Sequence, residues 1–203
     1  MSNRAADIGQ AWAASLTMGA GQFCTNPGVV LALKGEAFTA LQNAAITALN
    51  ASPAQKMLTD GIHSAYHSGV SALSKHATEV TGGQRADTPR HSHAAAFRVD
   101  ADTWLKTPAL HHEVFGAAGV FVECDDAQQM KDVAQDLAGQ LTITLQMDGG
   151  DTALAKDLLP IVEEKAGRLL CNGFPTGVEV CSAMMHGGHY TASNDSRSTS
   201  VGT

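Results

Sequence analysis

The chain alternates apolar segments of strand length with segments of helical spacing, and this alternation constrains its fold more than any other feature. Residues 28–34 (GVVLALK) form a continuous apolar run, and residues 36–51 after them are rich in Ala and Leu. A strand followed by a helix is therefore predicted here. Repeated alternation of this kind is typical of parallel strands joined by crossover helices. We predict an α/β fold of three layers, with a mostly parallel sheet covered by helices on both faces.

The most regular helical pattern lies in residues 126–138. Met130, Val133, Ala134 and Leu137 share one face there, Asp125 or Asp126 can cap the start, and Gly139 can mark the end. Pro160 falls inside another helical segment and predicts a kink, or a helix that starts near Leu159. The predicted helices are residues 8–16, 36–51, 60–76, 126–138 and 151–166, and the predicted strands are 28–34, 93–101, 117–123, 141–147 and 168–172.

Composition narrows the class of protein. The 203 residues are 44% hydrophobic, which suffices for a buried core, and the length favours one domain. The net charge of −7, without a basic cluster, disfavours nucleic acid and anionic membranes as partners. No apolar run approaches the roughly 20 residues of a membrane span, and the first residues do not resemble a secretory signal. Residues 184–203 are rich in Gly, Ser, Thr and His, which predicts a loop-rich tail.

Four cysteines occur at positions 24, 124, 171 and 181, without the spacing of a zinc site or a disulfide framework. Their surroundings are core-like, and a reducing cytoplasm is the predicted location. Cys24 differs, because it lies in a loop rich in Gly and Pro between a predicted helix and a buried strand. Such a loop can present a nucleophile, although a single cysteine is more often a small buried apolar residue.

Three segments together resemble the aldehyde dehydrogenase superfamily. GQFCTNPG (residues 21–28) is similar to the segment that carries the catalytic thiol, which implies this role for Cys24. HEVFG (112–116) resembles the element whose Glu binds the nicotinamide ribose and whose Phe packs near the nicotinamide, which implies Glu113 and Phe115. CNGFPTGV (171–178) and MMHGGHYTAS (184–193) resemble loops that line the aldehyde tunnel. The resemblance implies a substrate pocket that includes Phe23, Thr25, Phe174, His186 and His189.

The resemblance also implies a reaction. Cys24 would form a thiohemiacetal with a small aldehyde, a hydride would pass to NAD or NADP, and water would release the acid from a thioacyl enzyme. The sequences of GQFCTNPG and NGFPTGVEV most resemble those of the α-ketoglutarate semialdehyde (2,5-dioxopentanoate) dehydrogenases, whose product is 2-oxoglutarate. An NADP-preferring fatty aldehyde dehydrogenase is the alternative. The parent enzyme is expected to be a homo-oligomer.

The chain departs from the family before the cysteine. In the family the dinucleotide-binding domain, the oxyanion Asn and the general-base Glu all precede the thiol, whereas only 23 residues precede Cys24. Ala117 also replaces the Pro that usually follows Phe-Gly. We expect residues 1–203 to be a catalytic domain without its dinucleotide-binding domain, folded but inactive in isolation. Slow ester hydrolysis by Cys24 is a third possibility.

Two pairs of histidines are candidates for a functional role. His63 and His67 are four residues apart on a predicted helix and could chelate a metal, but no third ligand has a recognisable spacing, so a polar helix face is the better interpretation and no metal site is predicted. His186 or His189 could assist Cys24 as a base, or be ordinary loop residues.

Overall fold

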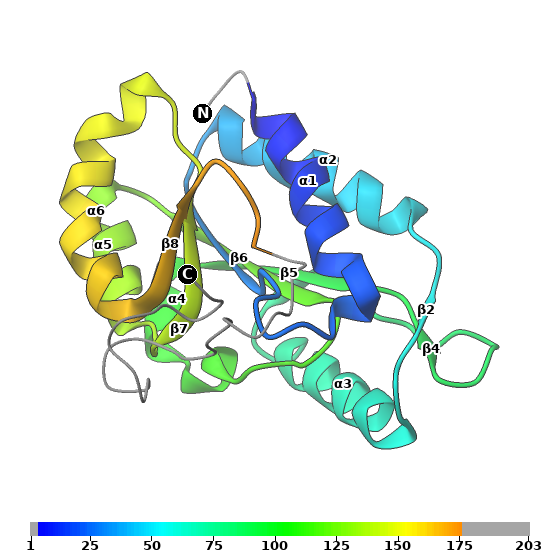
Figure 1. The fold of residues 1–203 in the computed structure, drawn as a ribbon. Coiled ribbons are helices and arrows are strands. Elements are labelled where there is room, and N and C mark those ends of the chain that lie inside the picture. Colours follow the sequence, from blue (N-terminus) through cyan, green and yellow to red (C-terminus); the bar gives the residue numbers. More distant parts are fainter. Residues whose placement is uncertain (1–3, 176–203) are drawn as a thin grey trace, which may run out of the picture.

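A four-stranded sheet forms the centre of the molecule in the computed structural model, which describes residues 4–175. Its strands lie in the order β1 (Val29–Leu33), β6 (Ala118–Cys124), β5 (Ala95–Asp100) and β3 (Thr78–Thr81). β1, β6 and β5 are parallel, and β3 pairs antiparallel with β5 at one edge (Figure 1). The predicted α/β fold with a mostly parallel sheet is confirmed.

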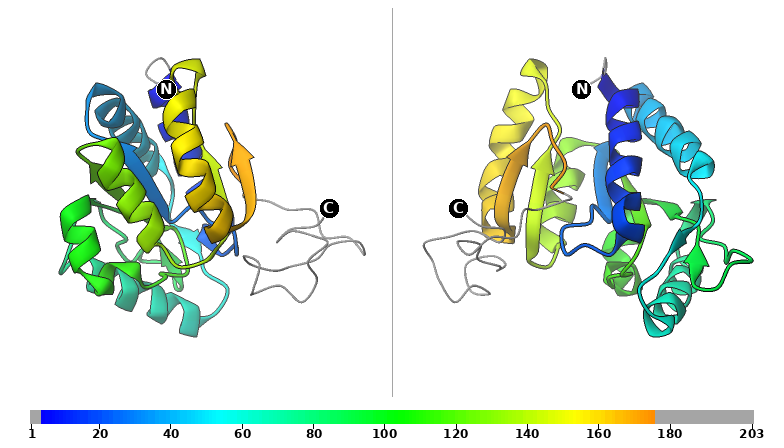
Figure 2. Two further views of the ribbon diagram at one scale, coloured as in Figure 1. Left: turned by 90° about the vertical axis from the view of Figure 1, so that its left-hand side faces the viewer. Right: turned by 45° about the vertical axis from the view of Figure 1, so that its right-hand side comes forward.

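Helices cover both faces of this sheet, which confirms the three layers (Figures 1 and 2). One face packs against α1 (Ala5–Thr17) and α2 (Glu36–Ala51). The other face packs against α3 (Asp60–Leu73), α4 (Ala101–Lys106), the short 3₁₀ helix η3 (Pro108–His111) and α5 (Ala127–Asp136).

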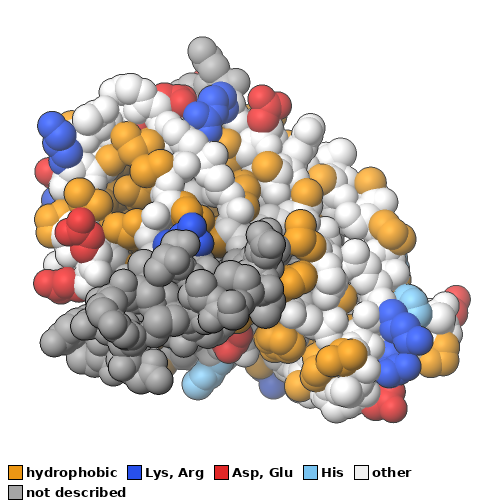
Figure 3. Space-filling view, in the orientation of Figure 1, with side chains coloured by type: hydrophobic (Ala, Val, Ile, Leu, Met, Phe, Trp, Pro, Cys, Tyr) orange, Lys and Arg blue, Asp and Glu red, His pale blue; other side chains and the backbone are white. Residues whose placement is uncertain are grey.

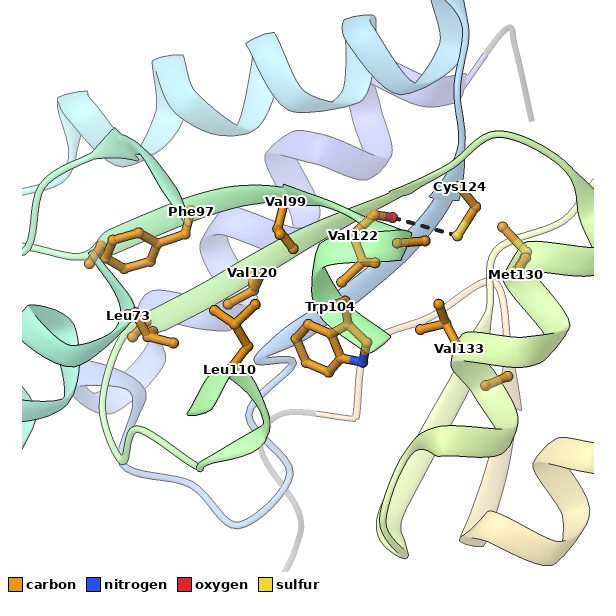
Figure 4. Packing of buried hydrophobic residues seen from close by; sticks show 14 of the residues in the cluster. Leu73, Phe97, Val99, Trp104, Leu110, Val120, Val122, Cys124, Met130 and Val133 are labelled. Atoms are coloured by element: carbon orange, nitrogen blue, oxygen red, sulfur yellow. Dashed lines mark hydrogen bonds between the residues drawn. The ribbon is translucent and has the colours of Figure 1, made fainter. Parts of the chain in front are cut away.

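Strand β6 contributes side chains to the hydrophobic cores on both faces of the sheet, because successive side chains of a strand point to opposite faces. Val120 and Val122 pack with Trp104 and Val133 in one core (Figure 4). Phe121 points the other way, and its ring centroid lies 4.7 Å from that of Trp12. A strand buried on both faces must be apolar at nearly every position, which explains its continuous apolar run.

A second, two-stranded parallel sheet consists of β7 (Gln140–Leu145) and β8 (Ala166–Cys171). The chain passes between them through η4 (Gly149–Asp151) and α6 (Thr152–Lys165), which packs beside α5. Arg4 links this unit to the start of the described chain, because its guanidinium donates to Asp148 Oδ1 (3.0 Å) and to Asn172 Oδ1 (3.3 Å).

Several predicted boundaries differ from the structure. The helix predicted to start near Leu159 is wrong, since α6 runs through Pro160. Proline has no backbone N–H, so one carbonyl of the preceding turn loses its helical hydrogen bond. Because Pro160 is exposed, water can donate a hydrogen bond to that carbonyl instead. Asp126 caps α5 as expected by accepting from the Gln129 amide (2.8 Å), but that helix ends at Asp136, before Gly139. Helix α3 likewise ends at Leu73, short of residue 76.

The sequence did not predict the shortest elements. These are α4, η3, the edge strand β3, and a small antiparallel pair of β2 (Gln55–Lys56) with β4 (His91–Ser92). Each is too short to establish a hydrophobic period.

The cysteines also differ in part from expectation. Cys124 is buried, as predicted, and burial beside three acidic residues raises the pKa of its thiol to about 12. Cys171 is exposed at the end of β8, so its core-like assignment was wrong. Cys181 lies outside the described residues. Within residues 4–175, no helix has the length and apolar character needed to cross a membrane.

Candidate functional site

The loop that carries Cys24 begins with a left-handed turn at the end of α1. The turn, labelled η2 (Met18–Gly21), has positive φ angles at Gly19 (57°), Ala20 (57°) and Gly21 (69°). A left-handed backbone is costly for residues with a Cβ and cheap for glycine. The turn reverses the chain direction after α1 and leaves Cys24 exposed on the loop that leads into β1.

Gly21 brings this loop into backbone contact with the segment before β6. A Cβ atom at Gly21 would lie 2.3 Å from both the Gly116 carbonyl carbon and the Ala117 nitrogen. The two backbones touch at a place that has no room for a side chain. The structure therefore places the cysteine segment directly against the end of the HEVFG segment.

Gln22 fixes the same loop from another side. Its side-chain oxygen accepts a hydrogen bond from the Leu58 amide (2.9 Å), and its side-chain nitrogen donates to the Gly19 carbonyl (3.0 Å). Phe23 is half-buried, and its ring packs so closely over Gly19 that a Cβ there would lie 2.7 Å away. Gln22 and Phe23, the two residues before Cys24, thus both hold the turn at Gly19.

Glu113 and Phe115 lie just before the contact with the loop. Glu113 is exposed, and Phe115 keeps 40% of its surface exposed. An exposed carboxylate can accept hydrogen bonds from a pair of hydroxyl groups, and an exposed aromatic ring offers an apolar face. Both side chains are thus available to a ligand that approaches the surface beside Cys24.

The third segment reaches the loop through Thr25. Thr25 is 3% exposed, and its hydroxyl donates to the Pro175 carbonyl (3.1 Å). Phe174 packs against the core cluster beneath α1 and α2. The structure thus joins residues 174 and 175 to the cysteine loop, although Thr25 itself points into the interior. His186 and His189 lie outside the described residues.

Tyr66 on α3 also packs against Gly116. The ring is so close that a Cβ at Gly116 would lie 2.5 Å from it. The hydroxyl donates to the His93 carbonyl (2.8 Å) and the Ala117 carbonyl (3.2 Å), and burial raises the pKa of this phenol. The sequence analysis missed Tyr66, because a lone tyrosine on a helix gives no signal of such a role.

Asn26 is the second residue that the sequence analysis missed. Its side-chain nitrogen lies within hydrogen-bond reach of the carbonyls of Leu16, Gly21 and Gly116. An asparagine in a Gly- and Pro-rich loop is typical of a turn, and the sequence gives no sign of its partners. These partners are known only from the folded backbone.

His63 and His67 pack against each other on α3, with ring centroids 4.7 Å apart. His67 Nε2 bonds to the Ser92 hydroxyl (2.7 Å), and His63 Nδ1 faces the Arg85 guanidinium (3.3 Å). Desolvation first, and then the charges of Arg85 and His63, lower the pKa of His67 to about 4. On the right-hand side of the molecule, where β2 and β4 lie, Lys and Arg side chains gather on the surface next to a His side chain (Figure 3).

A guanidinium beside the ring nitrogen disfavours a metal ion at these histidines. Within residues 4–175, no group of three or more His, Cys, Asp or Glu side chains is arranged to hold a metal.

A small pocket lies behind the loop, between η2, the β2–β4 pair and Tyr66. Its lining includes Ala20, Met57 and Ala117, and Cys24 is not part of it. The exposed thiol therefore faces the surface rather than this pocket.

Comparisons with known proteins show what the chain is similar to. No family model matches the chain. It is 48% identical over 190 residues to α-ketoglutaric semialdehyde dehydrogenase 2 of Azospirillum brasilense, which covers 93% of this chain and 36% of that protein. It is 40% identical over 203 residues to α-ketoglutaric semialdehyde dehydrogenase of Acinetobacter baylyi, which covers 98% of this chain and 39% of that protein. The chain thus spans less than two fifths of the length of these relatives.

Solved structures share the fold at lower identity. γ-Glutamyl-γ-aminobutyraldehyde dehydrogenase from Burkholderia cenocepacia has a TM-score of 0.72 at 18% identity, over 85% of this chain and 36% of that one. A 1-pyrroline-5-carboxylate dehydrogenase from Thermus with bound NAD has a TM-score of 0.72 at 15% identity, over 89% and 35%. In sequence and in fold, the chain is a relative of the aldehyde dehydrogenases.

Proposed function

We propose that this chain is the thiol-bearing part of an NAD(P)-dependent aldehyde dehydrogenase that oxidises α-ketoglutaric semialdehyde (2,5-dioxopentanoate) to 2-oxoglutarate. One observation carries the proposal: the exposed Cys24 lies on a loop that contacts both Gly116 and Pro175. Three segments that are far apart in the sequence therefore meet beside one thiol. The substrate is inferred from the names of the two relatives that are 48% and 40% identical.

In the proposed reaction the Cys24 thiolate attacks the aldehyde carbon and forms a thiohemiacetal. The backbone N–H of Cys24 would donate to the developing oxyanion, and loss of one such donor costs an enzyme about 3 to 4 kcal/mol of barrier. The C–H bond of the thiohemiacetal then gives up a hydride and leaves a thioester. Water hydrolyses this thioester, which releases the carboxylate and returns the thiol.

The residues present fit a nicotinamide cofactor as the hydride acceptor. NAD(P)+ supplies the two-electron oxidation when it is bound. The exposed carboxylate of Glu113 would accept the ribose hydroxyls, and the exposed ring of Phe115 would pack near the nicotinamide. A cytoplasmic location and a homo-oligomeric parent enzyme stay predictions.

The nucleophile can be tested on the chain itself with 2,5-dioxopentanoate that carries ¹³C at its aldehyde carbon. The thiohemiacetal signal should form with the wild-type chain and with Cys171→Ser, which removes the other exposed thiol among residues 4–175. The signal should disappear in Cys24→Ser. An adduct that persists in Cys24→Ser but is lost in Cys171→Ser would refute the assignment.

The substrate and the activity need separate measurements. A long-chain fatty aldehyde that forms the Cys24 adduct more readily than 2,5-dioxopentanoate would favour the fatty aldehyde dehydrogenase instead. NAD(P)+ reduction by the chain alone should be undetectable, because most of the length of the relatives is not represented in it. Measurable turnover would show that the chain is active without a dinucleotide-binding domain.

A further inference from the structure

Asn26 joins three parts of the backbone around the cysteine loop. Its side-chain nitrogen lies 2.8 Å from the Gly21 carbonyl, 3.2 Å from the Leu16 carbonyl and 3.4 Å from the Gly116 carbonyl. Leu16 belongs to the last turn of α1, Gly21 closes the left-handed turn, and Gly116 precedes β6. One carboxamide therefore connects the two ends of the turn to a segment 90 residues later.

The chemistry of these partners determines which way the carboxamide faces. All three neighbours are carbonyl oxygens, which only accept hydrogen bonds, so the side-chain nitrogen must face them. The side-chain oxygen is then buried without a hydrogen-bond partner. A buried acceptor without a partner costs free energy. The hydrogen bonds that the side-chain nitrogen donates to the carbonyls must therefore stabilise this orientation.

The Gly116 end of this connection is itself immobilised. Both the Gly21 backbone and the Tyr66 ring are in close contact with it. Its carbonyl accepts from the Ala118 amide (2.8 Å) as well as from Asn26. The segment that carries Glu113 and Phe115 is thus fixed at its C-terminal end, one to three residues from those side chains.

We propose that Asn26 is a positioning residue that clamps the Cys24 loop to the segment 113–116. Cys24 lies two residues before Asn26, so the clamp sets the spacing between the thiol and the residues assigned to the cofactor. It would also hold in place the backbone N–H of Cys24, which is the oxyanion donor of the proposed function. This inference rests on the proposed function and adds a residue that contacts neither substrate nor cofactor.

Amide hydrogen exchange tests the clamp on the chain as it exists. Exchange in both 22–28 and 113–117 should become at least about fivefold faster in Asn26→Ala, because one buried hydrogen-bonding group is lost. Asn26→Asp keeps the shape and loses the donors, so it should behave like Asn26→Ala. Asn43→Ala, at an exposed position of α2, is the matched control and should leave both segments unchanged. Wild-type exchange of 113–117 in Asn26→Asp would overturn the proposal.

The wild-type chain provides a second measurement that needs no variant. If Asn26→Ala and Asn26→Asp do not fold, exchange is followed in the wild type at rising denaturant. The amides of the two segments should then lose protection together, at one denaturant concentration below global unfolding. Separate openings of the two segments would overturn the clamp.

Acylation of Cys24 by 4-nitrophenyl acetate separates positioning from stability. The thiolate attacks the ester carbonyl, expels 4-nitrophenolate and forms an acetyl thioester, and an oxyanion develops on the way. The rate of acylation should fall at least about tenfold in Asn26→Ala. Alkylation by iodoacetamide forms no oxyanion, so its rate should change less than about twofold. Asn26→Ser restores one donor and should partly rescue acylation. Val133→Ala, destabilised in the core of the opposite face, should acylate at the wild-type rate.

The outcomes distinguish the two proposals. Equal slowing of acylation and alkylation, or equal slowing in Val133→Ala, would contradict a positioning role. If the wild-type chain is not acylated at Cys24, the proposed nucleophile fails, and the exchange experiment still decides the clamp.

Discussion

The hydroxyl of Thr25 donates a hydrogen bond to the carbonyl of Pro175, 3.1 Å away and 150 residues later in the chain. Thr25 directly follows Cys24, and Pro175 follows the loop after β8. The contact therefore connects the thiol-bearing loop to the two-stranded sheet, which forms no hydrogen-bonded ladder with the strands of the main sheet that the structure describes.

Replacing Thr25 by Val removes the hydroxyl and keeps the shape. Because Thr25 is buried and the Pro175 carbonyl loses its donor, we expect the free energy of unfolding to fall by about 1 to 2 kcal/mol. Thr47→Val is the control, since Thr47 is exposed on α2 and bonds only within its own helix. Urea unfolding measures both variants. Equal stability of Thr25→Val and wild type would show that the contact contributes nothing.

Replacing Gly21 by Ala introduces a methyl group where two backbones touch. The new Cβ would lie 2.3 Å from Gly116 and Ala117 atoms, and the φ of 69° is strained for any residue with a Cβ. We expect a loss of at least about 2 kcal/mol of stability, together with slower acylation of Cys24. Gly150→Ala meets no atom within 4 Å and should be nearly neutral in thermal unfolding. A Gly21→Ala variant as stable as Gly150→Ala would disprove the close contact.

Protonation of His67 should destabilise the fold below neutral pH. Desolvation, and then the charges of Arg85 and His63, lower the pKa of His67 to about 4. As pH falls below about 6.5, the unfolded chain therefore binds a proton at this histidine before the folded chain does. The contribution of neutral His67 to the free energy of unfolding is thus fully present above pH 6.5 and is lost as pH falls towards 4. Since solvent screens the partly exposed ring, we expect a loss of about 1 kcal/mol by pH 5.

Urea unfolding at pH 7.5 and pH 5 checks this expectation. His67→Gln should lose less stability between the two pH values than the wild type does. His76→Gln, at an exposed position after α3, is the control and should keep the wild-type pH dependence. The same pH dependence in His67→Gln and wild type would exclude His67 as the source.

Replacing Phe121 by Ala should cost about 3 to 5 kcal/mol of stability. Phe121 is fully buried, and its ring packs against those of Trp12 and Phe38. Phe115→Ala removes the same side chain from a site that is 40% exposed, so it should cost much less. Denaturant unfolding compares the two. Similar losses in both variants would show that burial in this core is not what makes Phe121 important.

The sequence alone determined where the longer strands and helices form. The apolar run of residues 117–123 and the period of 3.6 residues in 126–138 are local patterns, and each predicted the element that the structure contains. Cys24 was also placed correctly in a loop, because glycine and proline restrict the local backbone whatever the rest of the chain does.

Only the tertiary structure decided which of these segments meet. The antiparallel direction of β3, the separate pairing of β7 with β8 and the exposure of Cys171 depend on how whole elements pack. The partners of Asn26 and Thr25 lie up to 90 and 150 residues away, and a hydrogen bond across such a distance leaves no periodic trace in the sequence. Local backbone preferences act between near neighbours and can be read along the chain, whereas burial and long-range hydrogen bonds are set by the packing of the complete core.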